Sequence, residues 1–371
     1  MPLKIKTFDI GLFVIPLIFL AVSVAEIYGL VSGTNNEGLE IKQLIHGLIG
    51  LGLMVTAYLL DYRFFKGTAW IFYIISIILL VLVEIFGKTA KGATNWLDLG
   101  FFQLQPSEVA KVFLITSLAA FFSDKIGKLK FRDIALSALI LSIPLVLILK
   151  EPDFGSAMVI ILVYFTLLFA AKPARIHSAI ILAVIGILLS IVLLSYLKIF
   201  PFQHLLKDYQ RQRIAVFLDP ALDPMGRGYN VKQAQITIGA GGITGKGLGR
   251  GTQSQLQFLP EPHTDFIIAG IGESFGFLGI FFLLLLYCVF ILKLLTIAKL
   301  ARDNFGMLVV LGIAGVLLFQ GVINIGMNVG LMPVTGITLP FLSYGGTSLI
   351  MSFFAVGLVG SIFIRHKKIN F

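Results

Sequence analysis

The chain has 371 residues, of which 57% are hydrophobic and only 13% charged, and its mean hydropathy is +0.96. Soluble domains carry about 25% charged residues, so the composition excludes a soluble globular protein and predicts one that crosses a membrane repeatedly. The net charge of +10 does not indicate a nucleic-acid partner, because the basic residues gather in short clusters beside apolar segments. Cys288 is the only cysteine, which excludes an intramolecular disulfide and a metal site built on paired cysteines.

Ten apolar segments are each long enough to approach the roughly 20 residues that a membrane-spanning helix needs. The first is longer than the apolar core of a signal peptide, so we expect it to be retained as a span. Nine or eleven spans stay open alternatives, because the segments near Lys150–Asp153 and Pro333–Pro340 are short. The sequence predicts an all-α polytopic membrane protein that forms one integral membrane domain over residues 1–371. The expected spans are residues 8–31, 43–60, 69–87, 107–123, 132–149, 154–171, 177–197, 266–292, 306–331 and 341–364.

The basic residues favour an even number of spans with both termini in the cytoplasm. With ten spans and a cytoplasmic N-terminus, the inner segments carry sixteen Lys and Arg residues and the short outer loops carry four. This is the asymmetry that the positive-inside rule expects, and an odd number of spans would destroy it. The long segment 198–264 therefore faces the outside, between spans seven and eight.

The first half of this outer segment, residues 207–218, has the pattern of an amphipathic helix at the membrane surface. Arg211 and Arg213 either pair with lipid phosphates or hold this helix in place. The second half is rich in glycine. Residues 239–252 do not form a nucleotide-binding P-loop, because Ala240 and Gly247 occupy positions where that motif needs Gly and Ser or Thr.

Two alternatives remain for the glycine-rich stretch. It is either a flexible loop or a backbone that approaches an anion closely, with Lys246 and Arg250 supplying positive charge. A pyrophosphate on the outer face suits the second alternative, whereas ATP does not.

Three charged residues stand near the start of spans four and six. Glu108 and Lys111 are three residues apart, so they share a helix face and can pair. The pair either lowers the cost of membrane insertion or serves function, because each charge at a span centre costs roughly 2.5–3.5 kcal/mol. Asp153 is either the N-cap of span six or a second acid near the one at position 265.

The stretch from Phe258 to Gly276 is the strongest candidate for the reactive centre. Asp265 is predicted at the boundary between water and hydrocarbon, in the first turn of span eight, where an acid also favours the helix dipole. Glu261 and His263 can exchange protons or meet a cation beside it, and Glu273 lies two turns deeper. Such an acid can deprotonate a hydroxyl group of a lipid-anchored substrate.

Residues 324–330 and 333–348 bring amides and small polar residues, including Ser343, into or beside the last two spans. These residue types either serve close helix packing or line a groove for a polar head group.

Taken together, these motifs resemble the SEDS family (shape, elongation, division and sporulation), and they cover most of the chain in the family's order. The forms Gly-Thr-Gln at 251–253 and Gly-Met-Asn at 326–328 are more similar to the elongation member than to the division member. Two departures are Asn95, where the family often has a basic residue, and Ser274, where it often has an acid. The matching stretches are residues 105–111, 152–155, 211–229, 245–253, 258–266 and 324–346.

The resemblance implies a ten-span peptidoglycan glycosyltransferase of the bacterial cytoplasmic membrane that uses lipid II. It also implies a class B penicillin-binding protein as partner and places the family's essential acid at Asp265. Our hypothesis is that Asp265 is the general base. Lys246, Arg211, Arg213 or a divalent cation (Mg²⁺ or Mn²⁺) would neutralise the leaving pyrophosphate. The alternatives are a lipid II flippase and a scaffold for other wall enzymes.

Overall fold

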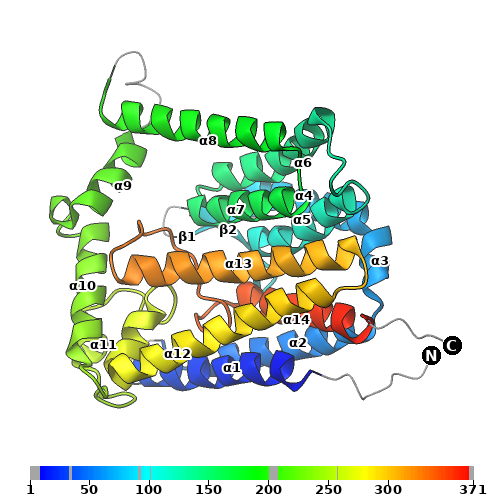
Figure 1. Ribbon diagram of the computed structural model, residues 1–371. Helices are drawn as coiled ribbons and strands as arrows, with labels where there is room; N and C mark the ends of the chain where they lie inside the picture. The colour runs from blue at the N-terminus through cyan, green and yellow to red at the C-terminus, as the bar shows by residue number, and fades with distance from the viewer. Residues whose placement is uncertain are drawn as a thin grey trace.

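The computed structural model describes residues 9–32, 36–90, 93–100, 102–199, 208–256 and 258–366 (Figure 1). Within these ranges, a long helix lies at each of the ten predicted spans. Their bounds are α1 Ile10–Val31, α2 Leu39–Leu59, α4 Ala69–Phe86, α5 Pro106–Ser123, α6 Phe131–Lys150, α7 Phe154–Ala170, α8 Arg175–Tyr196, α12 Ile267–Leu300, α13 Asn304–Asn328 and α14 Gly346–Ile364. A six-residue helix, α3 (Tyr62–Gly67), follows α2.

Eight of the described helices are long and apolar enough to cross a membrane, while α7 and the described part of α8 are shorter apolar helices. Helices suit this solvent because they satisfy their backbone polar groups internally. The chain is a multi-pass membrane protein, as predicted, and the number of its spans stays a prediction.

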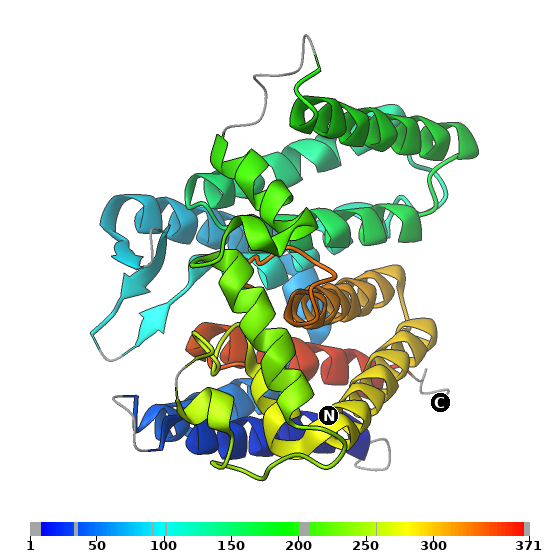
Figure 2. The ribbon, with the colours of Figure 1, turned by 90° about the vertical axis from the view of Figure 1, so that its left-hand side faces the viewer.

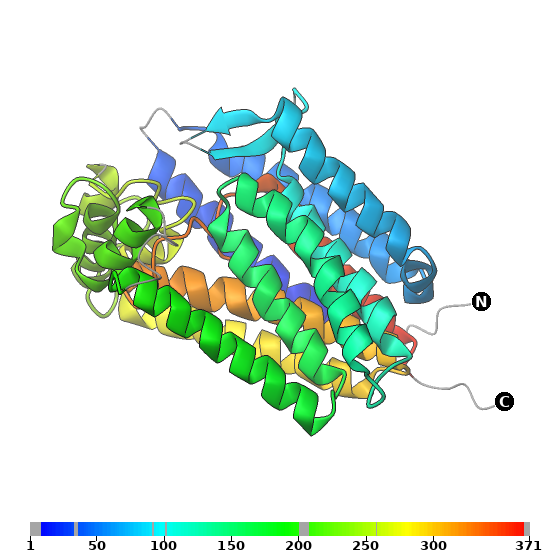
Figure 3. The ribbon, with the colours of Figure 1, turned by 90° about the horizontal axis from the view of Figure 1, so that it is seen from above.

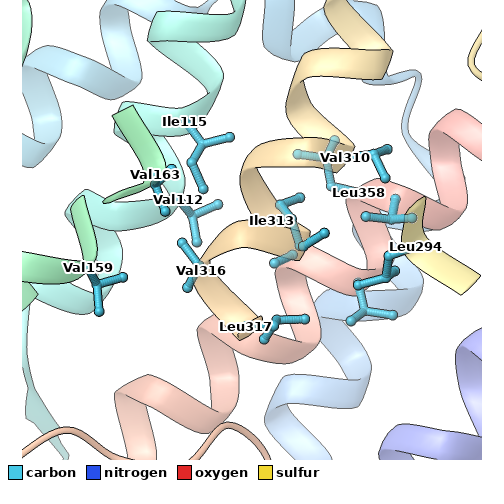
Figure 4. Packing of buried hydrophobic residues seen from close by; sticks show 14 of the residues in the cluster. Val112, Ile115, Val159, Val163, Leu294, Val310, Ile313, Val316, Leu317 and Leu358 are labelled. Carbon is cyan, nitrogen blue, oxygen red and sulfur yellow. The ribbon is translucent and has the colours of Figure 1, made fainter. Parts of the chain in front are cut away.

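Three helices form the centre of the bundle. In their most apolar windows, 83% of α5 and 72% of α13 and α14 is buried, against 28% of α2, α4 and α6. Figure 4 shows branched aliphatic side chains of α5, α7, α13 and α14 packing between these ribbons. Close approach is helped by glycine: a Cβ on Gly357 of α14 would collide with the backbone of Met54 in α2. The peripheral helices leave apolar faces for lipid.

The long segment between α8 and α12 folds at one end of the bundle (Figures 1 and 2). It contains α9 (Asp208–Leu218), a 3₁₀ turn η3 (Pro220–Leu222), α10 (Arg227–Ala240) and α11 (Thr252–Gln255). The start of α1 and the end of α14 lie together at the opposite end. The helix predicted over residues 207–218 is thus present as α9, while its place at a membrane surface stays a prediction.

A small antiparallel sheet, seen with its strands beside α4 in Figure 3, is the exception to the all-α prediction. Its strands are β1 (Lys88–Ala90), β2 (Ala93–Asp98) and β3 (Gln103–Leu104), in that order, with Leu97 opposite Leu104. The Thr347 hydroxyl donates to Gln103 O at 3.1 Å and accepts from Gln105 N at 3.0 Å. The sheet is thereby attached to the start of α14.

Helix α12 is broken at Gly276, where φ is +68°. The glycine-rich loop inserts at this break and takes up the backbone groups that the helix leaves unpaired. Lys246 N donates to Glu273 O at 2.9 Å, and Phe277 N donates to Gly242 O at 2.9 Å. A Cβ on Gly276 would collide with Gly245 N, so this close approach requires glycine. The loop is a built part of the fold rather than a flexible connection.

Candidate active site

Asp265 lies just outside α12, which corrects the expectation that it belongs to the first turn of that helix. The helix begins at Ile267, and Phe266 is its N-cap. Asp265 is partly buried, whereas Phe266 is 2% exposed. The acid is therefore neither sealed among packed helices nor fully in solvent.

Two asparagines of α13 hold the main chain of Asp265. Asn324 Nδ2 and Asn328 Nδ2 each donate to Asp265 O at 3.0 Å. Both asparagine side chains are fully buried at the C-terminal end of α13. A buried amide needs such partners, because leaving a buried polar group unpaired costs about 1–3 kcal/mol.

The segment before α14 holds the two residues that precede Asp265. Ser343 Oγ donates to Thr264 O at 2.6 Å and accepts from Leu339 N at 2.9 Å. Tyr344 N donates to His263 O at 2.8 Å. Ser343 was predicted to meet the substrate, and in the structure its hydroxyl holds the chain beside Asp265. Its role toward substrate stays untested.

The loop between α13 and α14 brings a second acid-bearing element toward Asp265. A Cβ on Gly336 would lie 3.8 Å from Asp265 Oδ2, which places this carboxylate against the loop. On the same loop, a Cβ on Gly155, in the first turn of α7, would lie 3.1 Å from Thr335 O. The N-terminus of α7 and the Asp265 carboxylate thus meet one short loop.

Asp153 caps this N-terminus, as predicted. Its Oδ1 accepts from Ser156 N at 2.9 Å, and its Oδ2 accepts from Ser107 Oγ of α5 at 3.1 Å. The side chain therefore joins α7 to α5, next to the Glu108–Lys111 pair in sequence. A role in binding substrate remains a prediction.

His263 and Glu261 lie on the turn before Asp265. His263 Nε2 is 3.8 Å from Glu261 Oε2, and the imidazole packs edge-on against the Tyr344 ring at 5.8 Å. Burial raises the pKa of the Tyr344 phenol, so it stays protonated at neutral pH. These contacts fix the turn, and they keep an imidazole and a carboxylate two and four residues from the candidate base.

The predicted Glu108–Lys111 ion pair is present. Lys111 Nζ lies 2.7 Å from Glu108 Oε1, with the two side chains 2% and 9% exposed. The pair lines a pocket between α5, α13 and α14, together with Gln320, Ser352 and aliphatic side chains such as Val316. Polar groups in an otherwise apolar pocket can orient a ligand.

Glu273 is fully buried, and its carboxylate is used by the glycine-rich loop and the start of α11. It accepts from Lys246 Nζ at 2.9 Å, Gln253 N at 2.9 Å, Ser254 N at 3.0 Å and Ser254 Oγ at 2.8 Å. The glycine-rich loop is thereby fastened to α12. The geometry gives Glu273 and Lys246 a structural role, and their predicted contact with substrate stays untested.

The two arginines proposed from sequence lie on α9. Arg211 donates from its guanidinium to Ser195 O at 3.2 Å and so joins α9 to α8. The Arg213 side chain lies outside the described residues. Among the described residues, no three His, Cys, Asp or Glu side chains gather to hold a metal ion. A divalent cation would therefore need oxygens of the substrate as additional ligands, which is common for Mg²⁺.

Sequence reasoning missed which residues hold the backbone of the site. Asn324 and Asn328 were assigned to helix packing or a polar groove, although two asparagines four residues apart lie on one helix face. Ser23 and Gln43 were not considered: Ser23 Oγ donates to Leu342 O at 2.6 Å, and Gln43 Nε2 donates to Ser343 O at 3.1 Å. Buried polar residues in apolar spans were the available signal.

Comparison with known proteins adds independent findings. The sequence pattern of the family described as "Cell cycle protein" and named for FtsW, RodA and SpoVE matches residues 5–368. Peptidoglycan glycosyltransferase MrdB of Escherichia coli K12 is 38% identical over 355 residues, which cover 95% of this chain and 94% of MrdB. The predicted resemblance to the family is confirmed.

Two solved structures are similar over nearly the whole chain. One, named "Structural coordination of polymerization and crosslinking by a peptidoglycan synthase complex", has a TM-score of 0.82 at 32% identity and covers 97% of this chain and 98% of that chain. Rod shape determining protein RodA of Thermus thermophilus has a TM-score of 0.72 at 27% identity, covering 99% and 100%. The likeness to the rod-shape member and the predicted helical membrane fold are confirmed.

Proposed function

The chain belongs to the FtsW, RodA and SpoVE family and is a peptidoglycan glycosyltransferase, and we propose that Asp265 is its general base, with lipid II as substrate. The observation that supports Asp265 most strongly is its placement. It is a partly buried acid outside a helix, held through its main chain by α13 and by the segment before α14. An acid held in this way keeps a fixed position while its carboxylate can face a bound sugar.

In the proposed reaction, Asp265 removes the proton from the 4-hydroxyl of the acceptor's terminal GlcNAc. The freed oxygen attacks C1 of the lipid-linked MurNAc, the C1–O bond to the pyrophosphate breaks, and undecaprenyl pyrophosphate leaves with that electron pair. A carboxylate with an ordinary pKa of about 4 is a weak base, so the proton moves late, as the new bond forms. The pyrophosphate bond supplies the driving force, and no nucleotide is needed.

The leaving group carries negative charge that must be stabilised. Lys111, Lys246, Arg211 and Arg213 are the cationic candidates, and a divalent cation bridging a site carboxylate and the pyrophosphate is the alternative. Glu108 and Asp153 position the start of α5 and α7 around the substrate. Glu261, His263, Glu273 and Ser343 complete the proposed substrate-binding set.

The cellular setting is part of the same proposal. We place the protein in the bacterial cytoplasmic membrane with both termini in the cytoplasm, so that residues 198–264 and Asp265 face the outside. There it would build glycan strands during wall elongation, beside a class B penicillin-binding protein that crosslinks them. The solved synthase complex, which coordinates polymerization and crosslinking, supports such a partner.

The test uses purified protein, with its transpeptidase partner, and lipid II in detergent. Asp265→Asn should lower the rate of glycan synthesis by about 10²–10⁴-fold, the usual contribution of a general base. The matched control is Asp303→Asn, because Asp303 also precedes a helix, where its Oδ1 accepts from Gly306 N at 2.8 Å. Asparagine preserves that cap, so the control should retain activity. Unchanged polymer yield in Asp265→Asn would overturn the assignment and favour a flippase or a scaffold.

A further inference from the structure

The start of α12 is interrupted by a side chain of α13. In a regular helix Ala269 N would donate to the carbonyl four residues earlier, which is Asp265 O. Instead, the Asn328 carboxamide lies between these two groups. Its Nδ2 donates to Asp265 O at 3.0 Å, and its Oδ1 accepts from Ala269 N at 3.2 Å. Ala269 N also reaches Phe266 O at 3.0 Å, a tighter contact that does not include Asp265.

Asn324, one turn earlier on α13, braces the same carbonyl. Its Nδ2 donates to Asp265 O at 3.0 Å and to Ile337 O at 2.7 Å. Asn328 Nδ2 donates in addition to Asn324 O at 2.9 Å, which orients the second amide from the first. Both side chains are 0% exposed, so water does not compete for these bonds. One peptide carbonyl is therefore fixed by two amides of a single helix face.

We propose that Asn328 and Asn324 are positioning residues for the glycosyl transfer, and that the Asn328 carboxamide keeps Asp265 in place by preventing α12 from extending over it. The inference rests on Asp265 being the general base. Without the wedge, Ala269 N can close the ordinary helical bond to Asp265 O. Because successive residues of a helix turn by about 100°, including Asp265 in α12 would swing its carboxylate away from the loop at Gly336.

The chain offers a control of matched cost. Tyr287 Oη of α12 donates to Leu317 O of α13 at 2.7 Å, so Tyr287→Phe removes one buried hydrogen bond between the same two helices. The experiment compares Asn328→Ala with Tyr287→Phe in the purified complex, with kcat and KM expressed per folded protein. Asn328→Ala should lower kcat by about 10–100-fold and leave KM within about threefold, as expected when a group loses its alignment. Tyr287→Phe should change neither.

A second variant keeps the inference testable if Asn328→Ala does not fold. Asn328→Asp has the shape of asparagine and can still accept from Ala269 N, but it can donate to Asp265 O only when its new carboxyl carries a proton. Its kcat, relative to the parent at each pH, should therefore rise as pH falls from 8 to 6.

The outcomes are separable. If Asp265→Asn destroys activity while folded Asn328→Ala keeps full kcat, the positioning inference fails and the proposed base stands. A flat activity ratio for Asn328→Asp between pH 8 and 6 would also overturn the positioning inference. If Asp265→Asn itself keeps activity, the proposed function fails first.

Discussion

Asp265 and Glu273 stand eight residues apart at the start of α12, yet the structure holds them by opposite parts. Glu273 is held by its carboxylate, which accepts four hydrogen bonds from the loop and the start of α11. Asp265 is held by its main-chain carbonyl, which accepts two bonds from the asparagines of α13. Glu273 is fully buried, whereas Asp265 is partly buried.

The difference separates two uses of an acid near a membrane. A carboxylate whose oxygens are already used by protein donors is stabilised as an anion and is a poor proton acceptor. Its energy goes into folding the loop that it holds. An acid anchored through its backbone is fixed in space without that cost to its basicity. We therefore expect loss of Glu273 to act on stability and loss of Asp265 to act on chemistry.

The largest effect on stability should come from the Glu108–Lys111 pair, whose carboxylate is also used by the protein. Lys111→Met leaves the Glu108 charge buried without its partner, and removing one member of a buried pair costs about 3–5 kcal/mol. Glu108→Gln combined with Lys111→Met should restore most of that loss. Thermal unfolding in detergent measures both variants.

The double variant then separates the two uses. Since the pair lines the pocket between α5, α13 and α14, we expect glycan synthesis by the stable double variant to be at least about tenfold slower. Full activity would instead place this pair with Glu273, as a purely structural one.

Glu273→Gln should act next most strongly. Glutamine keeps one acceptor oxygen but turns an amide toward the donors of Lys246 and Ser254, so we expect a loss of about 2–3 kcal/mol. Hydrogen exchange should accelerate across residues 246–254, and activity per folded protein should stay within about threefold. Ser254→Ala, which removes a single hydroxyl donor, is the graded control and should cost about 1 kcal/mol. A Glu273→Gln variant of normal stability but with the activity loss of Asp265→Asn would contradict the distinction.

Periodicity and hydropathy were enough to place the ten long helices, because membrane solvent permits few other structures. The same signals predicted the Glu108–Lys111 pair and the Asp153 cap, since both depend on spacing within one helix. Local sequence also identified Asp265 as the acid to test.

Contacts between segments far apart in sequence could not be predicted in this way. The position of Asp265 outside α12 depends on Asn328, 63 residues later, which occupies the place of a helical hydrogen bond. The structural use of Glu273 depends on a loop about twenty residues earlier, which fits only because of the break at Gly276. The sheet over residues 88–104 was missed because its strands are too short to show alternation.

One acid follows neither pattern. Glu151, between α6 and α7, is 4% exposed, and within the described residues its two carboxylate oxygens have no hydrogen-bond partner. Burial, followed by the charges of Asp153 and Glu84, raises its pKa from 4.5 to about 8. Glu151 is therefore held neither through its carboxylate, like Glu273, nor at an ordinary pKa.

Replacing this acid should produce the smallest effect, and one that depends on pH. Below pH about 4.5 the Glu151 carboxyl is protonated in both the folded and the unfolded chain, so it contributes nothing. Between pH 4.5 and 8 the unfolded chain releases the proton while the folded chain keeps it, so stability falls as pH rises. Glu151→Gln cannot ionise and should escape this loss. Because the site lies at the end of its helices, where water screens charge, we expect a gain of about 1–2 kcal/mol at pH 8 that vanishes near pH 4.5.

Melting temperatures of parent and variant, measured between pH 4.5 and 8.5 in one detergent, test this window. Asp61→Asn, at an exposed acid that caps α3, is the control and should show no such divergence. A pH-independent gain for Glu151→Gln would mean that the buried carboxyl is ionised in the folded protein and has a partner there. Glu151 would then be held through its carboxylate, as Glu273 is, and only Asp265 would be held by its backbone alone among the acids compared.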